Sequence, residues 1–224
     1  MSESTRSIMD VVEKSGIRFL RLGWVDNAGV YRVHAIRAKR IAQVAEEGLG
    51  LATGAQAVPV HEDVVSEGLP IGPVGQAWLI PDVASFRVLP WEPEHGAVMG
   101  SFVSQDGSPW PYCPRAVLQR QIDRLAERGL SMQAAFEHEF MLLKEEEGRL
   151  AHFESSHYAS THGLDAGGPL LDEMTRGLEE QGVDPADIHD TDQEEFTHTA
   201  VAAYVAAGMA DAGFGVEAAA RQFG

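Results

Sequence analysis

The stretch GIRFLRLGWVDNAGVYRVHAIR, residues Gly16–Arg37, predicts two β-strands joined by a tight turn. Both flanking runs are rich in aliphatic, aromatic and β-branched residues, which favour extended backbone. Between them stands DNAG, in which Asn27 and Gly29 tolerate positive φ and Asp26 favours a turn. We therefore expect an exposed β-hairpin that begins its turn at Asp26.

The segments around this hairpin predict short elements. One helical piece is expected near Ile8–Lys14, and RIAQVAEEG, which ends at Gly48, predicts a second short helix. From Gly48 to Pro93, Gly and Pro are too frequent for long regular elements, so short strands linked by turns are expected. The best strand candidates in this region are AWLIPDV and AVMGSFVS. The first half of the chain is therefore predicted to be β-rich.

The pattern changes after the turn-rich passage QDGSPWPYCP, which we take as the domain boundary. PRAVLQRQIDRLAERG predicts a helix with Pro114 in its first turn, an apolar stripe, and Gly129 at its C-terminal end. LSMQAAFEHEFMLL then predicts a strand, and KEEEGRLAHF a charged turn that leads into another strand. PLLDEMTRGLEEQG predicts a second amphipathic helix. The second half is therefore expected to be α+β.

Composition limits the classes of partner. The 224 residues carry a formal net charge of −17, which repels phosphate backbones and anionic lipid, so nucleic acid and membrane surfaces are not expected partners. The single cysteine, Cys113, excludes an internal disulfide and fits a reducing compartment. The sequence shows neither a secretory leader nor an apolar run long enough to span a bilayer. We expect a cytoplasmic protein.

Two glutamates stand inside the apolar run AAFEHEFMLL, at positions 137 and 139. On a strand these residues point to the same face, with Cα atoms about 6.6 Å apart. One interpretation is that this face is half-exposed and both carboxylates are simply solvated. The other follows from Met141 and Leu143, which continue the same face: unpaired buried carboxylates are costly, and a divalent cation between Glu137 and Glu139 would resolve the conflict.

The order of segments resembles that of the glutamine synthetase family. WVDNAG is followed by LPWEPEHGAVMGSFVSQDGSPWPYCPRAVLQR and then by AAFEHEFMLL. Members of that family show a D-x-x-G turn, a strand region, a helix entered through PR-x-x-L, and then G-x-E-x-E-F. The resemblance covers roughly residues 15 to 190. It implies a β-grasp-like N-terminal domain over residues 15–105, followed by an incomplete glutamine synthetase-type catalytic α+β domain over residues 112–224.

The resemblance also implies a reaction and its residues. In the family, the two glutamates of the E-x-E strand bind two divalent cations, Mg²⁺ or Mn²⁺, which hold the phosphates of ATP; Glu137 and Glu139 match these positions. Phosphoryl transfer to glutamate gives γ-glutamyl phosphate, which ammonia or a small amine then attacks. Asp26 matches an aspartate that acts at the neighbouring subunit's site, so a homo-oligomer is implied. The alternative for Asp26 is a role in the turn alone.

The resemblance is weaker towards the C-terminus. In DIHDTDQEEFTHT, Gln193 and Glu195 fit the end of a family segment that supplies further metal ligands, which makes Glu195 the third candidate. Family members are also much longer, so catalytic competence of this chain alone is in doubt. Two hypotheses result: an ATP-dependent carbon–nitrogen ligase of glutamine synthetase type, or a non-catalytic relative that serves as an assembly or regulatory module.

Overall fold

The structure is a computed structural model that describes residues 3–59, 68, 71–132, 140–157, 160–183, 203, 205–207 and 221. The chain divides into two compact units, Met1–Ala166 and Gly167–Gly224. The elements of the first part of the chain are α1 (Glu3–Lys14), β1 (Phe19–Val25), β2 (Tyr31–Arg37), α2 (Ala38–Glu47), β3 (Leu49–Ala52), η1 (Thr53–Gln56), β4 (Gln76–Pro81), η2 (Val83–Ser85), β5 (Arg87–Val88), β6 (His95–Val103) and α3 (Pro114–Ala126). They are followed by β7 (Leu143–Glu146), β8 (Arg149–His152) and α4 (Thr161–Glu180).

Six strands form one mixed sheet. Its order is β2-β1-β6-β4-β3, and β5 also pairs with β6. The β1–β6 pair is parallel, whereas β1–β2, β3–β4, β4–β6 and β5–β6 are antiparallel. The expected hairpin is confirmed, with Val25 opposite Tyr31 next to the turn. The expected strands AWLIPDV and AVMGSFVS are confirmed as β4 and β6.

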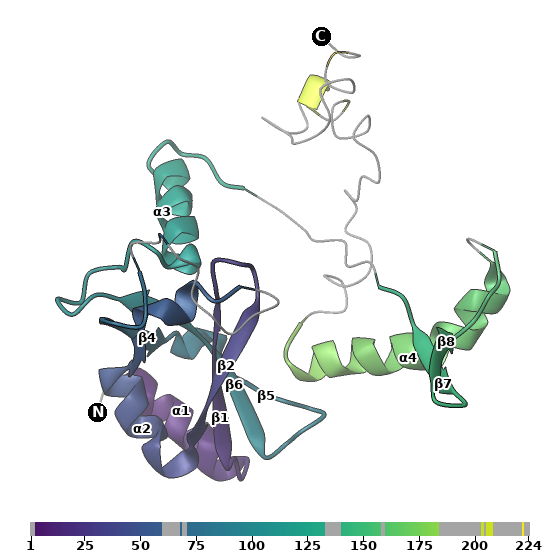
Figure 1. Cartoon of the computed structure of the whole chain (residues 1–224), viewed down its shortest axis with the longest axis horizontal. Helices are drawn as coiled ribbons and strands as arrows, with labels where there is room; N and C mark the ends of the chain where they lie inside the picture. The colour runs from purple at the N-terminus through teal and green to yellow at the C-terminus, as the bar shows by residue number, and fades with distance from the viewer. Residues whose placement is uncertain are drawn as a thin grey trace. The chain divides into compact units, whose positions relative to one another are not determined.

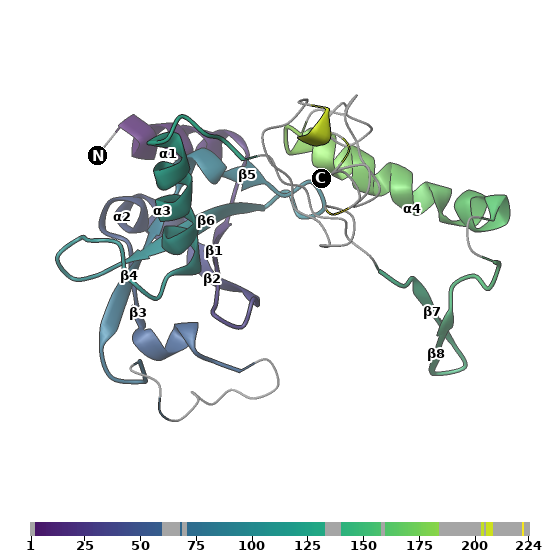
Figure 2. The ribbon, with the colours of Figure 1, turned by 90° about the horizontal axis from the view of Figure 1, so that it is seen from above.

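One face of the sheet carries the core. Buried and partly exposed residues alternate along β6, as a strand with one covered face requires. Helices α1 and α2 lie side by side against that face (Figures 1 and 2). The core consists of Ile8, Val12, Ile17, Leu20, Leu22, Trp24, Ile36, Ile41, Val44, Ala77, Leu79, Val98, Phe102, Trp110, Cys113 and Ala116. The core-facing residues of the strands and the apolar faces of α1 and α2 thus form one buried apolar layer.

Helix α2 ends where the sequence predicts. Gly48 has φ 76° and ψ −179°, a conformation that is essentially restricted to glycine, and its N–H donates to the Val44 carbonyl at 2.9 Å. The chain can therefore leave the helix and enter β3 at the next residue. The first helix is also confirmed, although α1 begins at Glu3 rather than near Ile8.

Helix α3 confirms the prediction for PRAVLQRQIDRLAERG. Pro114 occupies its first turn, and Gly129 has φ 71° just beyond its end. The expected apolar stripe is present, but Val117, Leu118 and Ile122 are exposed. In this helix Ala116 is the buried residue. The packing of α3 is therefore concentrated in its first turn.

The strand expected over residues 130–143 is wrong at Phe140, Met141 and Leu142, which form no strand. Ladder hydrogen bonds need a partner strand, and the described pairing of β7 with β8 stops at Leu143 opposite His152. Residues 133–139 lie outside the described part of the chain. The strand predicted after the charged turn is confirmed as β8.

Helix α4 begins eight residues before the predicted start at Pro169, which lies inside it. The earlier start is explained by Ser160, whose Oγ accepts the His162 N–H at 3.2 Å, as an N-cap residue does. Among the described helices, none is both long and apolar enough to cross a membrane.

Candidate functional site

Asp26, directly after β1, organises the hairpin turn. Its Oδ1 accepts the backbone N–H groups of Ala28 and Val30, both at 2.9 Å. Its Oδ2 accepts Nε–H of Arg32 at 2.5 Å. Gly29 takes φ 80° and donates its N–H to the Asp26 carbonyl at 3.0 Å. One side chain thus closes the turn and joins it to β2.

The hairpin turn is exposed at residues 27–29, as expected, but the side chain of Asp26 is buried. The residue is 1% exposed, and the Arg32 side chain is 25% exposed. A carboxylate can be buried when its acceptor sites are filled by donors and its charge is balanced. Because Arg32 and two turn amides meet these conditions, the Asp26 carboxylate needs no contact with water. The turn interpretation describes what Asp26 does in this structure, and its role at a neighbouring subunit's site stays a prediction.

The hairpin turn also contacts the segment that follows β3. The Asn27 N–H donates to the Gln56 carbonyl at 3.0 Å, and Nη2 of Arg32 donates to the Val58 carbonyl at 3.4 Å. Because β2 and β3 are the two ends of the strand order, these bonds show that the sheet curls until its ends approach each other. We call this junction of the hairpin with residues 53–58 the seam.

A cleft of about 460 Å³ opens at the seam. Its walls are mainly aliphatic and aromatic, and one cationic side chain contributes to them; the lining residues are Trp24, Val30, Tyr31, Arg32, Val33, Ala55 and Val58.

Gln56 lies in the same segment with its side chain buried. Within the described residues, its amide N and O have no hydrogen-bond partner, and neither has Nε1 of Trp24. An unpaired buried polar group costs about 1–3 kcal/mol, so a further donor or acceptor at the seam would stabilise the domain.

Tyr31 lines the cleft and is half-exposed. Its ring lies over Gly23 of the paired strand so closely that a Cβ atom at position 23 would overlap the phenol. Partial burial raises the pKa of the Tyr31 phenol, and the nearby Arg21 guanidinium opposes that rise. Tyr31 therefore remains a neutral hydrogen-bonding group at physiological pH.

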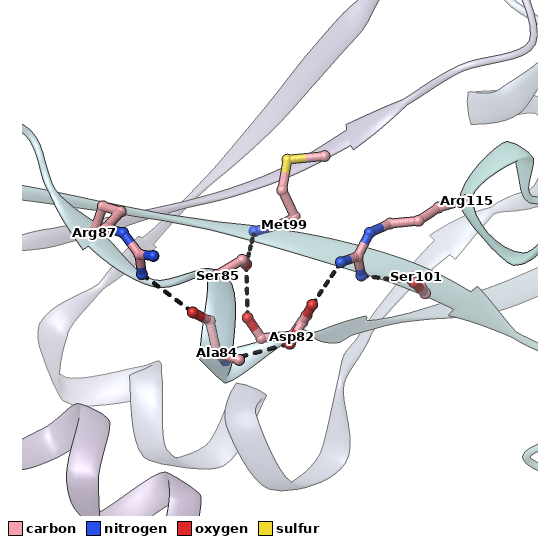
Figure 3. A network of polar contacts seen from close by, with 7 residues as sticks. All are labelled: Asp82, Ala84, Ser85, Arg87, Met99, Ser101 and Arg115. Carbon is pink, nitrogen blue, oxygen red and sulfur yellow. Dashed lines mark hydrogen bonds and ion pairs between the residues drawn. The ribbon is translucent and has the colours of Figure 1, made fainter. Parts of the chain in front are cut away.

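A second aspartate directly follows β4. Oδ1 of Asp82 accepts the Ala84 N–H at 3.2 Å, and Oδ2 accepts Nη2–H of Arg115 at 2.5 Å (Figure 3). Nη1 of Arg115 also donates to Oγ of Ser101 at 3.2 Å. These contacts join the start of α3 to β4 and β6.

The predicted metal ligands Glu137, Glu139 and Glu195 lie outside the described residues, so their predicted roles stay predictions. Within the described residues, there is no group of three or more His, Cys, Asp or Glu side chains that could hold a metal ion. The acids at positions 145–147, which belong to the predicted charged turn, are exposed.

Sequence reasoning missed Arg32, Gln56, Asp82 and Arg115. Arg32 could have been found, because a hairpin with the DNAG turn places it near Asp26. The Asp82–Arg115 contact spans 33 positions and Gln56 meets the hairpin only through the curl of the sheet, so the sequence carries no local signal for either.

Comparison with known proteins agrees with this arrangement. Residues 4–110 match the glutamine synthetase N-terminal domain family, and residues 169–224 match a model described as a PBP superfamily domain. Two solved structures share the fold: "Apo GmaS without ligand", with a TM-score of 0.61, 21% identity and 78% of this chain covered, and a "novel glutamine synthase homolog", with 0.57, 19% and 74%. These alignments cover 40% and 39% of the respective structures.

Curated relatives are similar over much of the chain. A type-1 glutamine synthetase of Dictyostelium discoideum is 30% identical in an alignment of 187 residues that covers 75% of this chain and 38% of the relative. A γ-glutamylpolyamine synthetase of Streptomyces coelicolor is 28% identical in an alignment of 178 residues that covers 78% of this chain and 38% of the relative. A γ-glutamylanilide synthase of an Acinetobacter species is 23% identical in an alignment of 158 residues that covers 63% of this chain and 31% of the relative. The chain spans about a third of the length of these relatives.

The fold is thus a curled, mixed α/β sheet of the type seen in glutamine synthetase-like proteins. The N-terminal portion of this chain contains a glutamine synthetase N-terminal domain over residues 4–110, and its homologues include glutamine synthetases and γ-glutamyl-amine ligases. The resemblance seen in the sequence is confirmed, and the relatives are ligases of that family.

Replacement of Asp26 tests how the turn is held. In D26N the amide oxygen can still accept the turn N–H groups, but the amide nitrogen cannot accept Nε–H of Arg32. We expect the free energy of unfolding to fall by about 2 kcal/mol. The loss is smaller than for a fully buried ion pair, because Arg32 is partly exposed and water screens its charge. Urea denaturation measures this loss. The control is D10N, which changes an exposed carboxylate on α1. Equal midpoints for the two variants would contradict the assignment.

Proposed function

We propose that this chain is part of an ATP-dependent carbon–nitrogen ligase that joins ammonia or a small amine to the γ-carboxyl group of glutamate. ATP transfers its γ-phosphoryl group to that carboxylate, which yields ADP and γ-glutamyl phosphate. The amine nitrogen then attacks the acyl carbon, phosphate leaves, and the amine loses a proton. The observation that carries the proposal is the match to the Dictyostelium relative, which covers 75% of the chain.

A match of that length has to run through the centre of the chain, where Glu137 and Glu139 stand. We assign these two carboxylates, with Glu195 as a third candidate, to divalent cation binding, because Mg²⁺ and Mn²⁺ prefer oxygen ligands. When bound, such a cation supplies neutralisation of the charge that develops on the phosphoryl oxygens. The chain's own part is to supply these carboxylates as oxygen ligands.

The acceptor amine is the open part of the proposal, and two observations bear on it. Both oxygens of Asp26 are engaged, so an ammonium ion would have to replace Arg32 at Oδ2. Beside it, the cleft at the seam has aromatic and aliphatic walls that suit an organic substituent. The relatives include enzymes named as a glutamine synthetase, a γ-glutamylanilide synthase, a γ-glutamylpolyamine synthetase and a glutamate–isopropylamine ligase. Both observations favour a small organic amine over ammonia.

A second candidate is a non-catalytic assembly or regulatory module. The match of residues 169–224 to the PBP superfamily model favours it, because the resemblance predicted a continuing catalytic domain, with Glu195, in this segment. An activity assay separates the two candidates.

A substrate screen tests the ligase proposal. The chain, expressed with any coding sequence that continues its reading frame, is incubated with ATP, glutamate, Mg²⁺ and a series of amines from ammonia to polyamines. We expect ADP release that requires both glutamate and an amine, and product formation is checked by mass spectrometry. The E137Q/E139Q variant is the control. Absence of turnover with every amine, in a protein that remains folded, would favour the regulatory module.

Metal binding by the paired glutamates is tested without turnover. We expect E137Q/E139Q to bind Mn²⁺ about tenfold or more weakly than the wild type, because the cation loses two oxygen ligands. The matched control is E145Q/E147Q, which removes two exposed carboxylates with the same spacing. Mn²⁺ titration followed by electron paramagnetic resonance measures both. Identical binding curves for E137Q/E139Q and the wild type would remove the metal assignment.

The proposed role of Asp26 at a neighbouring subunit's site requires a homo-oligomer. We expect the chain to self-associate at micromolar concentration, as measured by light scattering. A strictly monomeric wild type would exclude a cross-subunit role for Asp26.

A further inference from the structure

The first turn of α4 is held by local contacts. Ser160 accepts the His162 N–H through Oγ at 3.2 Å, and its carbonyl accepts the Leu164 N–H, also at 3.2 Å. Glu154 lies close to the same turn, because a Cβ atom added at Gly163 would stand 3.3 Å from Oε2 of that glutamate. The glycine at position 163 therefore has a packing reason, and the start of α4 is fixed.

The last turn of α4 is closed by a glycine cap. Gly182 takes φ 85°, and its N–H donates to the Glu179 carbonyl at 2.8 Å. The Val183 N–H donates to the Leu178 carbonyl at 3.1 Å. These two bonds form a Schellman motif, which satisfies carbonyl groups that would otherwise lack a partner at the helix end. The helix is thus stabilised at both ends.

The middle of α4 contains three successive residues that weaken a helix: Gly167, Gly168 and Pro169. Proline has no N–H, so the Asp165 carbonyl cannot accept the usual helical bond from position 169, and the proline ring crowds that carbonyl. Each glycine adds backbone freedom that the helix must restrict. A residue before proline is also pushed away from helical geometry through its Cβ atom, which Gly168 lacks.

Packing does not account for these glycines. Among the described residues, a Cβ atom added at Gly167 or Gly168 would meet no heavy atom within 4 Å, in contrast to Gly163. Neither glycine is among the described residues with positive φ, so alanine could adopt both conformations. Within α4, which the structure describes from end to end, no residue is buried. Tertiary contacts therefore do not compensate for the weak central turn.

Two independent boundaries fall at the same place. The first compact unit of the chain ends at Ala166 and the second begins at Gly167. The match to the PBP superfamily model begins at residue 169. We propose that Gly167–Pro169 form a hinge inside α4, at which the helix bends and allows the chain beyond it to turn relative to the chain before it. Hinges of this kind place the change in φ and ψ in a few residues. The inference is independent of the ligase proposal.

The distance between two spin labels on α4 tests the hinge. The labels are attached to L164C and E180C in the full chain, in a C113S background, because both positions are exposed and lie on opposite sides of the glycines and the proline. A straight helix separates their Cα atoms by about 24 Å. We expect double electron–electron resonance to give a distance distribution at least twice as wide in the wild type as in G167A/G168A/P169A.

The matched control is G177A. It makes the same glycine-to-alanine change in the same helix, also where an added Cβ meets nothing within 4 Å among the described residues, but away from the proline. We expect G177A to keep the broad distribution of the wild type. Far-UV circular dichroism confirms that each variant is folded.

Three results would overturn the hinge. A wild-type distribution as narrow as that of G167A/G168A/P169A shows a rigid helix, and a narrow distribution at a shorter distance shows a fixed kink. A distribution in G167A/G168A/P169A that stays as broad as in the wild type places the motion elsewhere. Equal narrowing in G177A shows a general effect of helix propensity. If the triple variant does not fold, P169A alone replaces it, and an unchanged width in P169A overturns the inference.

Discussion

A carboxylate removed from water must be matched by donors, and this requirement shapes the hairpin on which the sheet is built. Asp26 is buried because two turn amides and Arg32 saturate it. Arg32 also donates from Nη2 to the Val58 carbonyl, so the side chain that balances the charge of Asp26 also connects the two ends of the sheet. Together with the bond from the Asn27 N–H to the Gln56 carbonyl, this pair connects the hairpin to the segment after β3 at the seam.

The same arrangement occurs twice. Asp82, like Asp26, directly follows a strand, accepts the N–H of the residue two positions later through Oδ1, and accepts an arginine through Oδ2. In each case the aspartate first stabilises the local turn and then serves as a fixed anchor for a more distant element. Arg32 brings in the segment after β3, and Arg115 brings in α3. The difference is exposure, because the first pair is largely buried and the second is only partly so.

This arrangement explains how an N-terminal domain without described metal ligands could contribute to the proposed ligase. A saturated Asp26 leaves little room for an ammonium ion but stands beside an apolar cleft, which fits the amine-ligating relatives. In the sequence, α3 precedes the segment that contains Glu137 and Glu139.

Local patterns were sufficient for the elements with local causes. The β-rich composition around the DNAG turn predicted β1 and β2, the apolar runs AWLIPDV and AVMGSFVS predicted β4 and β6, and the glycine at position 48 predicted the end of α2. These features are properties of a few neighbouring residues. The order of motifs also indicated the family. Burial of Asp26, exposure of the α3 stripe, and the bridge from Arg115 to Asp82 and Ser101 were decided only by tertiary structure. Each depends on which surfaces come into contact after the sheet curls. A contact between residues 33 positions apart, such as Asp82 and Arg115, produces no periodic pattern in the sequence from which it could be predicted.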